Sequence, residues 1–91
     1  MDLALPSRPI ELVAIDPARN IRRRYRIAVD RDLFGDWIVE TGWGRIGAAG
    51  SRITERFDDP VEAARCVRRT LARRASAPRR IGAAYRPAEG S

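Results

Sequence analysis

The residues with the clearest chemical potential lie in one short stretch, Thr41 to Gly50. It contains Trp43 and Arg45, and it holds four of the seven glycines of the chain. An indole beside a guanidinium group can stack on a base or sugar and contact a phosphate, and neither interaction reads a base sequence. The same side chains also have structural uses, because an aromatic ring can pin a turn to a sheet and an arginine can bond turn carbonyls. The stretch predicts a contact surface on a tight turn, and both uses of Trp43 and Arg45 remain open.

Residues 42–47 also spell the glycine pattern G-x-G-x-x-G. That pattern binds a dinucleotide where it follows a strand and opens a helix, so that the pyrophosphate meets the helix N-terminus. Here the following segment, Ser51 to Phe57, alternates like a strand. A kinase-type glycine loop does lie between strands, but the strand lysine and HRD motif that accompany it are missing, since the chain has no lysine. We therefore expect no nucleotide cofactor.

No residue pattern in the chain indicates catalysis. The chain has no histidine and no lysine, and its acidic residues are scattered, so neither an acid–base pair nor an activated nucleophile is visible. The single cysteine, Cys66, forbids an internal disulfide and argues against a zinc site. We expect Cys66 to pack as a small hydrophobic residue, and we expect no enzyme activity, no metal and no cofactor.

Positive charge is concentrated in the last third of the chain. All 18 basic residues are arginine and 12 residues are acidic, which gives a net charge of +6. Residues 1–60 hold ten arginines and ten acidic residues, whereas residues 61–91 hold eight arginines and two acidic residues. A one-sided basic field is the footprint expected of a protein that binds nucleic acid, and equally of a solvated helix face.

The 91 residues suit one small domain. We expect a flexible tail over residues 1–9, a domain over 10–86 and a short tail over 87–91. There is no run of about 18 apolar residues, and the N-terminus lacks the charged and apolar regions of a secretory signal. Together with the lone cysteine, these features predict a cytoplasmic protein that does not contact membranes.

Four segments have the apolar pattern of β-strands, and short connections between them predict an antiparallel sheet: residues 10–15, 22–30, 37–41 and 51–57. Alternation would place Trp43 on the same face as Trp37, although Gly42 and Gly44 favour a bulge between them. Trp37 itself is expected in the core, because it lies mid-strand beside Val39.

An amphipathic helix follows the strands. Asp59 suits the N-cap, Pro60 suits the first helical position, and Glu62 completes a pattern like a capping box. The helix should run to about Ala75, with an apolar stripe formed by Ala63, Ala64, Val67, Leu71 and Ala75, flanked by Arg68 and Arg74. The opposite face carries Arg65, Arg69 and Arg73. The expected fold is therefore α+β, a small antiparallel sheet with one helix packed on one face, followed by a basic tail able to fold back through Ile81 and Tyr85.

With these elements in order, the chain resembles the WGR domain family over about residues 12–86. The matching residues are Tyr25-Arg26-Ile27, Trp37-Ile38-Val39, Trp43-Gly44-Arg45-Ile46-Gly47, Gly50, Phe57 and Ala63-Ala64. The segment Gly82 to Tyr85 is close to the Gly-Tyr that usually follows the helix, with two alanines inserted. The resemblance implies a small antiparallel sheet with one packed helix, a module found in DNA-dependent poly(ADP-ribose) polymerases and in short bacterial proteins.

In those polymerases the module binds DNA at breaks. The resemblance implies that Trp43 packs on a sugar at a DNA end, and that Arg45 faces a phosphate or couples the contact to a neighbouring domain. The sequence given contains no zinc finger and no ADP-ribosyl transferase domain, so the coupling role has no partner within it.

We predict a non-catalytic module that binds nucleic acid, DNA rather than RNA, without reading sequence. The expected contact residues are Trp43, Gly44, Arg45, Arg52, Arg65, Arg69 and Arg73. The alternative is a protein-interaction module, including a homodimer formed through an open sheet face.

Overall fold

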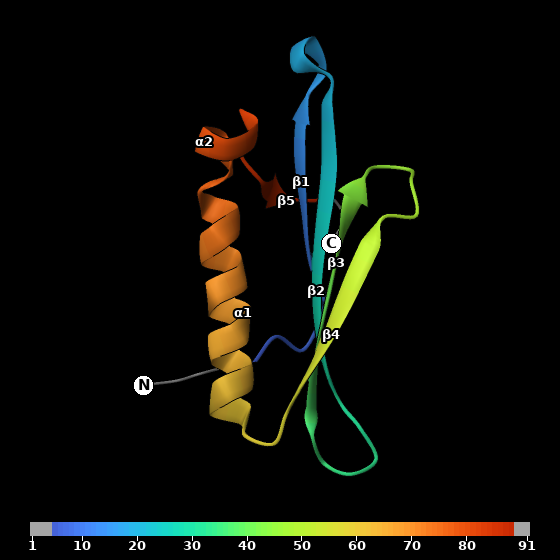
Figure 1. Ribbon diagram of the computed structural model, residues 1–91, viewed down its shortest axis with the longest axis vertical. Coiled ribbons are helices and arrows are strands. Elements are labelled where there is room, and N and C mark those ends of the chain that lie inside the picture. The colour runs from blue at the N-terminus through green and yellow to red at the C-terminus, as the bar shows by residue number, and fades with distance from the viewer. Residues whose placement is uncertain (1–4, 89–91) are drawn as a thin grey trace.

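The computed structural model describes residues 5–88, apart from the side chains of residues 80 and 81, and shows a twisted antiparallel sheet with one long helix on one face (Figure 1). The strands are β1 (Ile10–Asp16), β2 (Ile21–Arg31), β3 (Trp37–Arg45), β4 (Ser51–Phe57) and β5 (Arg86–Pro87). The helices are the 3-10 turn η1 (Pro17–Arg19), α1 (Pro60–Ala75) and α2 (Ala77–Ile81). The strand order across the sheet is β4-β3-β2-β1-β5. The expected α+β fold is confirmed.

The pairing of β3 with both neighbours is continuous. Opposite β2 it runs one to one from Trp37 against Arg31 to Arg45 against Arg23, and opposite β4 it runs equally regularly. The bulge expected from Gly42 and Gly44 is therefore absent from β3. Gly44 instead lets the backbone of the following turn pass close to β3, because a Cβ at Gly44 would lie 2.8 Å from the Cα of Gly50.

The helix begins where the sequence predicts. The Asp59 carboxylate accepts a hydrogen bond from the backbone N–H of Val61 at 2.8 Å, and Pro60 occupies the first turn. The capping box is wrong in one detail: Glu62 does not reach back to the cap but accepts a hydrogen bond from Nη1 of Arg65 at 2.9 Å. The helix ends at Ala75, as expected, but Ala75 itself is exposed.

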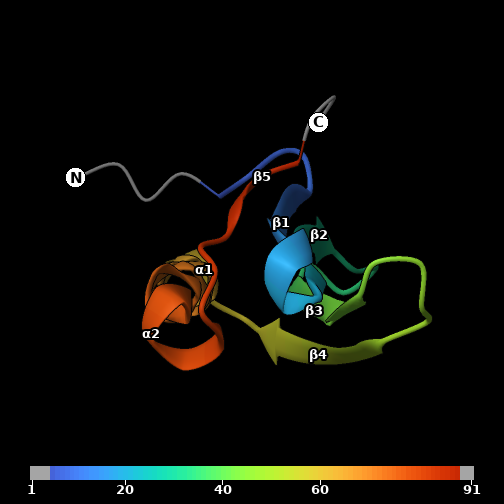
Figure 2. The same cartoon turned by 90° about the horizontal axis from the view of Figure 1, so that it is seen from above.

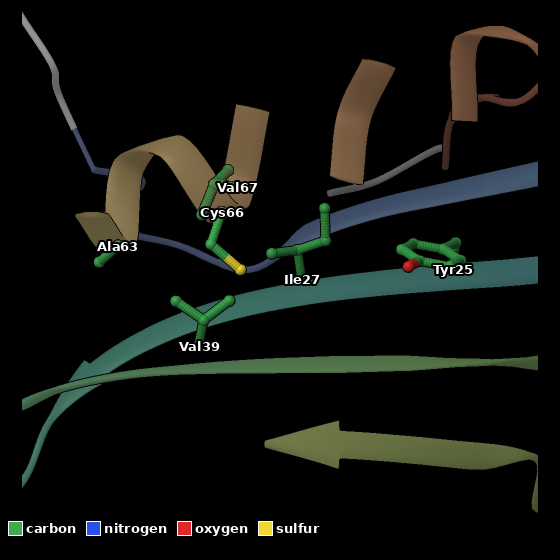
Figure 3. Close-up of a cluster of buried hydrophobic side chains, with 6 residues drawn as sticks. All are labelled: Tyr25, Ile27, Val39, Ala63, Cys66 and Val67. Atoms are coloured by element: carbon green, nitrogen blue, oxygen red, sulfur yellow. The ribbon is translucent and has the colours of Figure 1, made fainter. Parts of the chain in front are cut away.

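The core lies between α1 and the facing side of β2 and β3. Figure 3 shows the two sets of buried side chains meeting there: Tyr25, Ile27 and Val39 from the strands, with Ala63, Cys66 and Val67 from the helix. Cys66 lies within this core, which fits its expected use as a small hydrophobic residue. Trp37 packs against the same core and is partly buried.

The C-terminal segment returns from α2 to the edge of the sheet beside β1 (Figure 2). After α2, the two residues of β5 pair with β1, and the N–H of Ala88 donates to the carbonyl of Glu11 at 2.9 Å. Tyr85 packs against the core, as expected; the side chain of Ile81 is outside the described atoms. Of the expected tails, residues 1–4 and 89–91 are also outside the described range, and Leu5 packs against the core. None of the helices within residues 5–88 is long and apolar enough to cross a membrane.

Candidate nucleic-acid interface

A pocket of about 490 Å³ lies at the end of the sheet where β3 finishes and η1 leads into β2. We call it the basic pocket. Its lining contains no acidic residue and combines five arginines with two aromatic rings: Arg19, Arg22, Arg23, Arg45, Arg74, Trp43 and Tyr85, with Asn20, Ile21 and Gly44 completing the wall. The pocket is therefore an electropositive hollow with an aromatic floor, a combination suited to an anion that carries a flat or apolar group.

Trp43 serves both structure and surface. It lies directly opposite Tyr25 in the β2–β3 ladder, and the two rings are stacked with centroids 6.3 Å apart and planes 21° apart. Tyr25 is 7% exposed, whereas Trp43 is 38% exposed. The core thus holds the indole in place from one side, while more than a third of its surface remains available for contact.

Arg45 holds the neighbouring turn. Its Nη2 donates to Oδ1 of Asn20 at 2.9 Å, and its Nη1 lies 3.3 Å from the carbonyl oxygen of the same residue. Asn20 has a left-handed conformation (φ 56°) at the end of η1, so these bonds fix the residue that precedes β2. The guanidinium group has five N–H donors and is exposed, which leaves donors for a ligand.

Arg74 comes to the pocket from the last turn of α1. Its Cζ lies 4.3 Å from the ring centroid of Tyr25 and 5.9 Å from that of Tyr85. The two rings are themselves packed edge to face, with centroids 6.1 Å apart. Cation–π attraction therefore orients this guanidinium group, while its Nε is buried without a hydrogen-bond partner among the described residues. Burial raises the pKa of Tyr25, and the positive charge of Arg74 offsets only part of this increase. The phenol therefore stays neutral.

Two arginines face each other directly across the strands at the pocket. Arg23 of β2 pairs in register with Arg45 of β3. Like charges directly opposite each other in an antiparallel ladder destabilise the sheet. An anion bound between them would remove that repulsion.

The turn that follows Arg45 is tied to the sheet from the other face. Nη2 of Arg24 donates to the carbonyl oxygens of Ala48 and Ala49, at 2.6 Å and 2.8 Å. The N–H of Ile46 donates to the carbonyl of Arg22 at 2.9 Å. These bonds hold the turn, and with it Trp43 and Arg45, in one arrangement.

The structure brings together three of the seven predicted contact residues and places the other four elsewhere. Trp43, Gly44 and Arg45 line the basic pocket, whereas the remaining four do not: Arg52, Arg65, Arg69 and Arg73. Arg52 lies on the uncovered sheet face, 4.0 Å from Glu40. Arg69 and Arg73 border a separate groove between α1 and β4.

Sequence reasoning missed four of the five pocket arginines and Tyr85. Arg19, Arg22 and Arg23 belong to the η1–β2 corner, and Arg74 appeared only as a flank of the apolar stripe. One signal was available: an antiparallel hairpin between the second and third strands sets the arginine run 22–24 beside the Trp-Gly-Arg segment.

Metal binding and thiol chemistry within residues 5–88 both depend on side-chain geometry. Among residues 5–88, no group of three or more His, Cys, Asp or Glu side chains is placed to hold a metal ion. The Cys66 thiol donates to Oε2 of Glu55 at 3.4 Å. Burial, followed by that carboxylate, raises the pKa of this thiol, which disfavours the nucleophilic thiolate.

Comparison with known proteins identifies the family of this chain. The chain is 37% identical over 51 residues to y4dW, an uncharacterized protein of Sinorhizobium fredii; the match covers 56% of this chain and 25% of the relative, so the chain spans about a quarter of that protein. No solved structure matches the chain significantly. The family model of the WGR domain matches residues 9–77, which include β1 to β4 and all of α1. The chain belongs to the WGR domain family.

Proposed function

We propose that this protein is a non-catalytic module that binds nucleic acid through the basic pocket. The observation that carries the proposal is the set of five arginines around a partly exposed indole, with no acidic residue in the pocket wall. Phosphates would occupy the space between the guanidinium groups, and a sugar or base would pack on Trp43. Stacking on a base contributes about 1–3 kcal/mol, and phosphate contacts add affinity by releasing counterions.

We further propose that binding does not depend on base sequence. Asparagine and glutamine read adenine by paired hydrogen bonds, yet the chain has a single asparagine and no glutamine. That asparagine, Asn20, is already bonded to Arg45. The apolar side of α1, which includes Val67, packs on the sheet, so the helix is not free to enter a groove with that side. The preference for DNA over RNA rests on the chain's family, whose members in poly(ADP-ribose) polymerases bind DNA at breaks.

The exposed arginines outside the pocket would act at longer range. Arg65 is exposed on α1, Arg69 and Arg73 border the groove between α1 and β4 rather than the helix face opposite the sheet, and Arg52 lies on the open sheet face. These charges would attract a polyanion without fixing its position, an effect that salt screens. We therefore assign contact to the pocket residues and steering to the other four.

Binding of short fluorescein-labelled oligonucleotides, measured by anisotropy at two salt concentrations, tests the proposal. Blunt duplex, nicked duplex and single strand would each be compared. Trp43→Ala should weaken binding by about 5- to 150-fold, the equivalent of the stacking energy. Arg45→Gln should reduce the slope of log affinity against log salt by about 1, because one phosphate contact is lost.

Arg52→Gln is the matched control, since it removes the same charge outside the pocket. The loss of affinity caused by Trp43→Ala should therefore be the same with or without the Arg52→Gln substitution. Absence of binding at low salt for every oligonucleotide would contradict the proposal. So would equal losses for Arg45→Gln and Arg52→Gln, because only net charge would then matter.

A further inference from the structure

Two large apolar side chains stand in solvent at the tip of the β2–β3 hairpin. Leu33 is 100% exposed and Phe34 is 87% exposed, more than any other large hydrophobic residue of the described chain. The hairpin tip is at the opposite end of the molecule from η1 and α2, and so from the basic pocket (Figure 1). An adjacent exposed pair of this size is typical of a contact with another molecule.

The tip is held in a fixed conformation. Oδ1 of Asp32 accepts hydrogen bonds from the N–H groups of Phe34 and Asp36, both at 2.9 Å. Arg56 of β4 forms salt bridges with the carboxylates of Asp32 and Asp36. Nη2 of Arg31 donates to the carbonyl of Gly35 at 2.8 Å. A rigid tip loses little conformational entropy when it docks, which favours association.

A largely apolar groove of about 550 Å³ lies at the base of the same hairpin. Leu5, Pro6, Val29 and Trp37 form its apolar wall. Arg31 belongs to both features, because its guanidinium lies 4.6 Å from the Trp37 ring centroid while it bonds the tip at Gly35. The tip does not fill its own groove, as the exposure of its two apolar side chains shows.

We propose that the groove is occupied by a second copy of this chain, with Leu33 and Phe34 of each copy inserted into the groove of the other. A two-fold dimer requires a patch that is complementary to itself, and a projection and a hollow at one end of one hairpin provide it.

The charge of the hairpin permits a second copy to dock and does not favour a polyanion. The chain carries +6 overall, but the hairpin end has three aspartates against two arginines: Asp30, Asp32, Asp36, Arg31 and Arg56. Two copies can therefore meet there without the repulsion that their basic ends would produce, whereas an anionic membrane or a nucleic acid gains no attraction.

Sedimentation velocity over a range of protein concentrations tests the dimer. The wild-type chain should shift from monomer to dimer, and Leu33→Ser with Phe34→Ser should raise the dissociation constant by about 30-fold or more, as expected for loss of an interface anchor. The groove variant Leu5→Asp should have the same effect. Ile53→Ser is the matched control, because Ile53 is a 49% exposed apolar residue of β4 outside both features.

Mixing separates the proposed insertion from other modes of association. The tip variant retains a groove and the Leu5→Asp variant retains a tip, so a mixture should form heterodimers with one working contact. In a Trp43→Phe background, emission from Trp37 should move to shorter wavelength as dimers form. A wild-type chain that stays monomeric, a dimer that survives the tip variant or the groove variant, or tip-dependent binding to lipid vesicles instead of self-association would each overturn the proposal.

Discussion

The turn after β3 brings Gly50 very close to the backbone of Trp43. Replacing Gly50 by alanine should therefore destabilise the fold strongly. A Cβ at Gly50 would lie 2.3 Å from the carbonyl oxygen of Trp43 and 3.2 Å from its carbonyl carbon. That carbonyl cannot move away freely, because Trp43 is paired in the sheet with Tyr25 on one side and Ser51 on the other. The substitution therefore acts on the backbone that presents the indole.

Gly47→Ala in the same turn is the reference with which the stability loss of Gly50→Ala is compared. Both glycines have positive φ, 88° at Gly47 and 70° at Gly50, so alanine at either position incurs about 1–2 kcal/mol of backbone strain. A Cβ at Gly47 meets nothing within 4 Å. At Gly50 the forced displacement adds about 1–3 kcal/mol, by analogy with overpacked sites. We expect losses of about 1–2 kcal/mol for Gly47→Ala and about 2–5 kcal/mol for Gly50→Ala.

Urea unfolding followed by circular dichroism measures both losses on one scale. In thermal unfolding, each kcal/mol should lower the midpoint by about 4–8 °C for a domain of this size. Oligonucleotide binding by the folded fraction should also weaken for Gly50→Ala, because Trp43 is displaced, and should be retained by Gly47→Ala. If the two variants were equally stable within about 0.5 kcal/mol, the tight return of the turn onto β3 would be refuted.

Three further predictions concern the helix cap, the thiol and the hairpin tip. Asp59→Ala should cost about 1 kcal/mol in unfolding free energy because the cap bond is lost, whereas Asp58→Ala next to it should cost less. The Cys66 thiol should react with an alkylating reagent much more slowly in the native protein than in urea, and Glu55→Gln should increase the native rate, because burial and that carboxylate raise the pKa of the thiol; equal rates in both states would contradict its burial. Burial opposes ionisation of Asp32, but hydrogen bonds from the backbone and the charge of Arg56 outweigh it and lower its pKa below 3.8. The ionised Asp32 side chain therefore contributes its full stabilisation at pH values above its pKa in the unfolded chain. This stabilisation is lost as the pH falls through its lower pKa in the folded protein. In Asp32→Asn, the free energy of unfolding should therefore depend less steeply on pH below about 4.

The sequence predicts those parts of the fold that local chemistry decides. Alternation defines the faces of the central strands, so Trp43 lies on the Trp37 side as the pattern requires. The helix start at Asp59 follows from the cap and from Pro60, which suits the first turn. By contrast, β5 consists of two residues that become a strand only by pairing with β1, and no period can be read from so short a segment.

The candidate site was harder to predict because it depends on how elements meet. The Trp-Gly-Arg segment was recognisable by itself, but Arg23 joins it only through the β2–β3 register, and Arg74 only through the position of the helix end over Tyr25. The prediction that Arg65, Arg69 and Arg73 contact nucleic acid rests on their alignment along one face of the helix. Alignment along a helix says which residues share a face, and packing against the sheet decides where that face points.

The contrast between the two ends of this chain gives the strongest reason to treat the pocket arginines as binding residues. At the hairpin end and on the open sheet face, several arginines have carboxylate partners: Arg56 pairs with two aspartates, and Arg26 lies between Glu11 and Glu40. In the basic pocket only Arg19 has such a partner, Asp16 at 3.7 Å, whereas the other four form no salt bridge within the described residues. A cluster of like charges without carboxylate partners reduces stability, so fold stability alone does not account for this one. A bound polyanion would supply the negative charge that the pocket lacks.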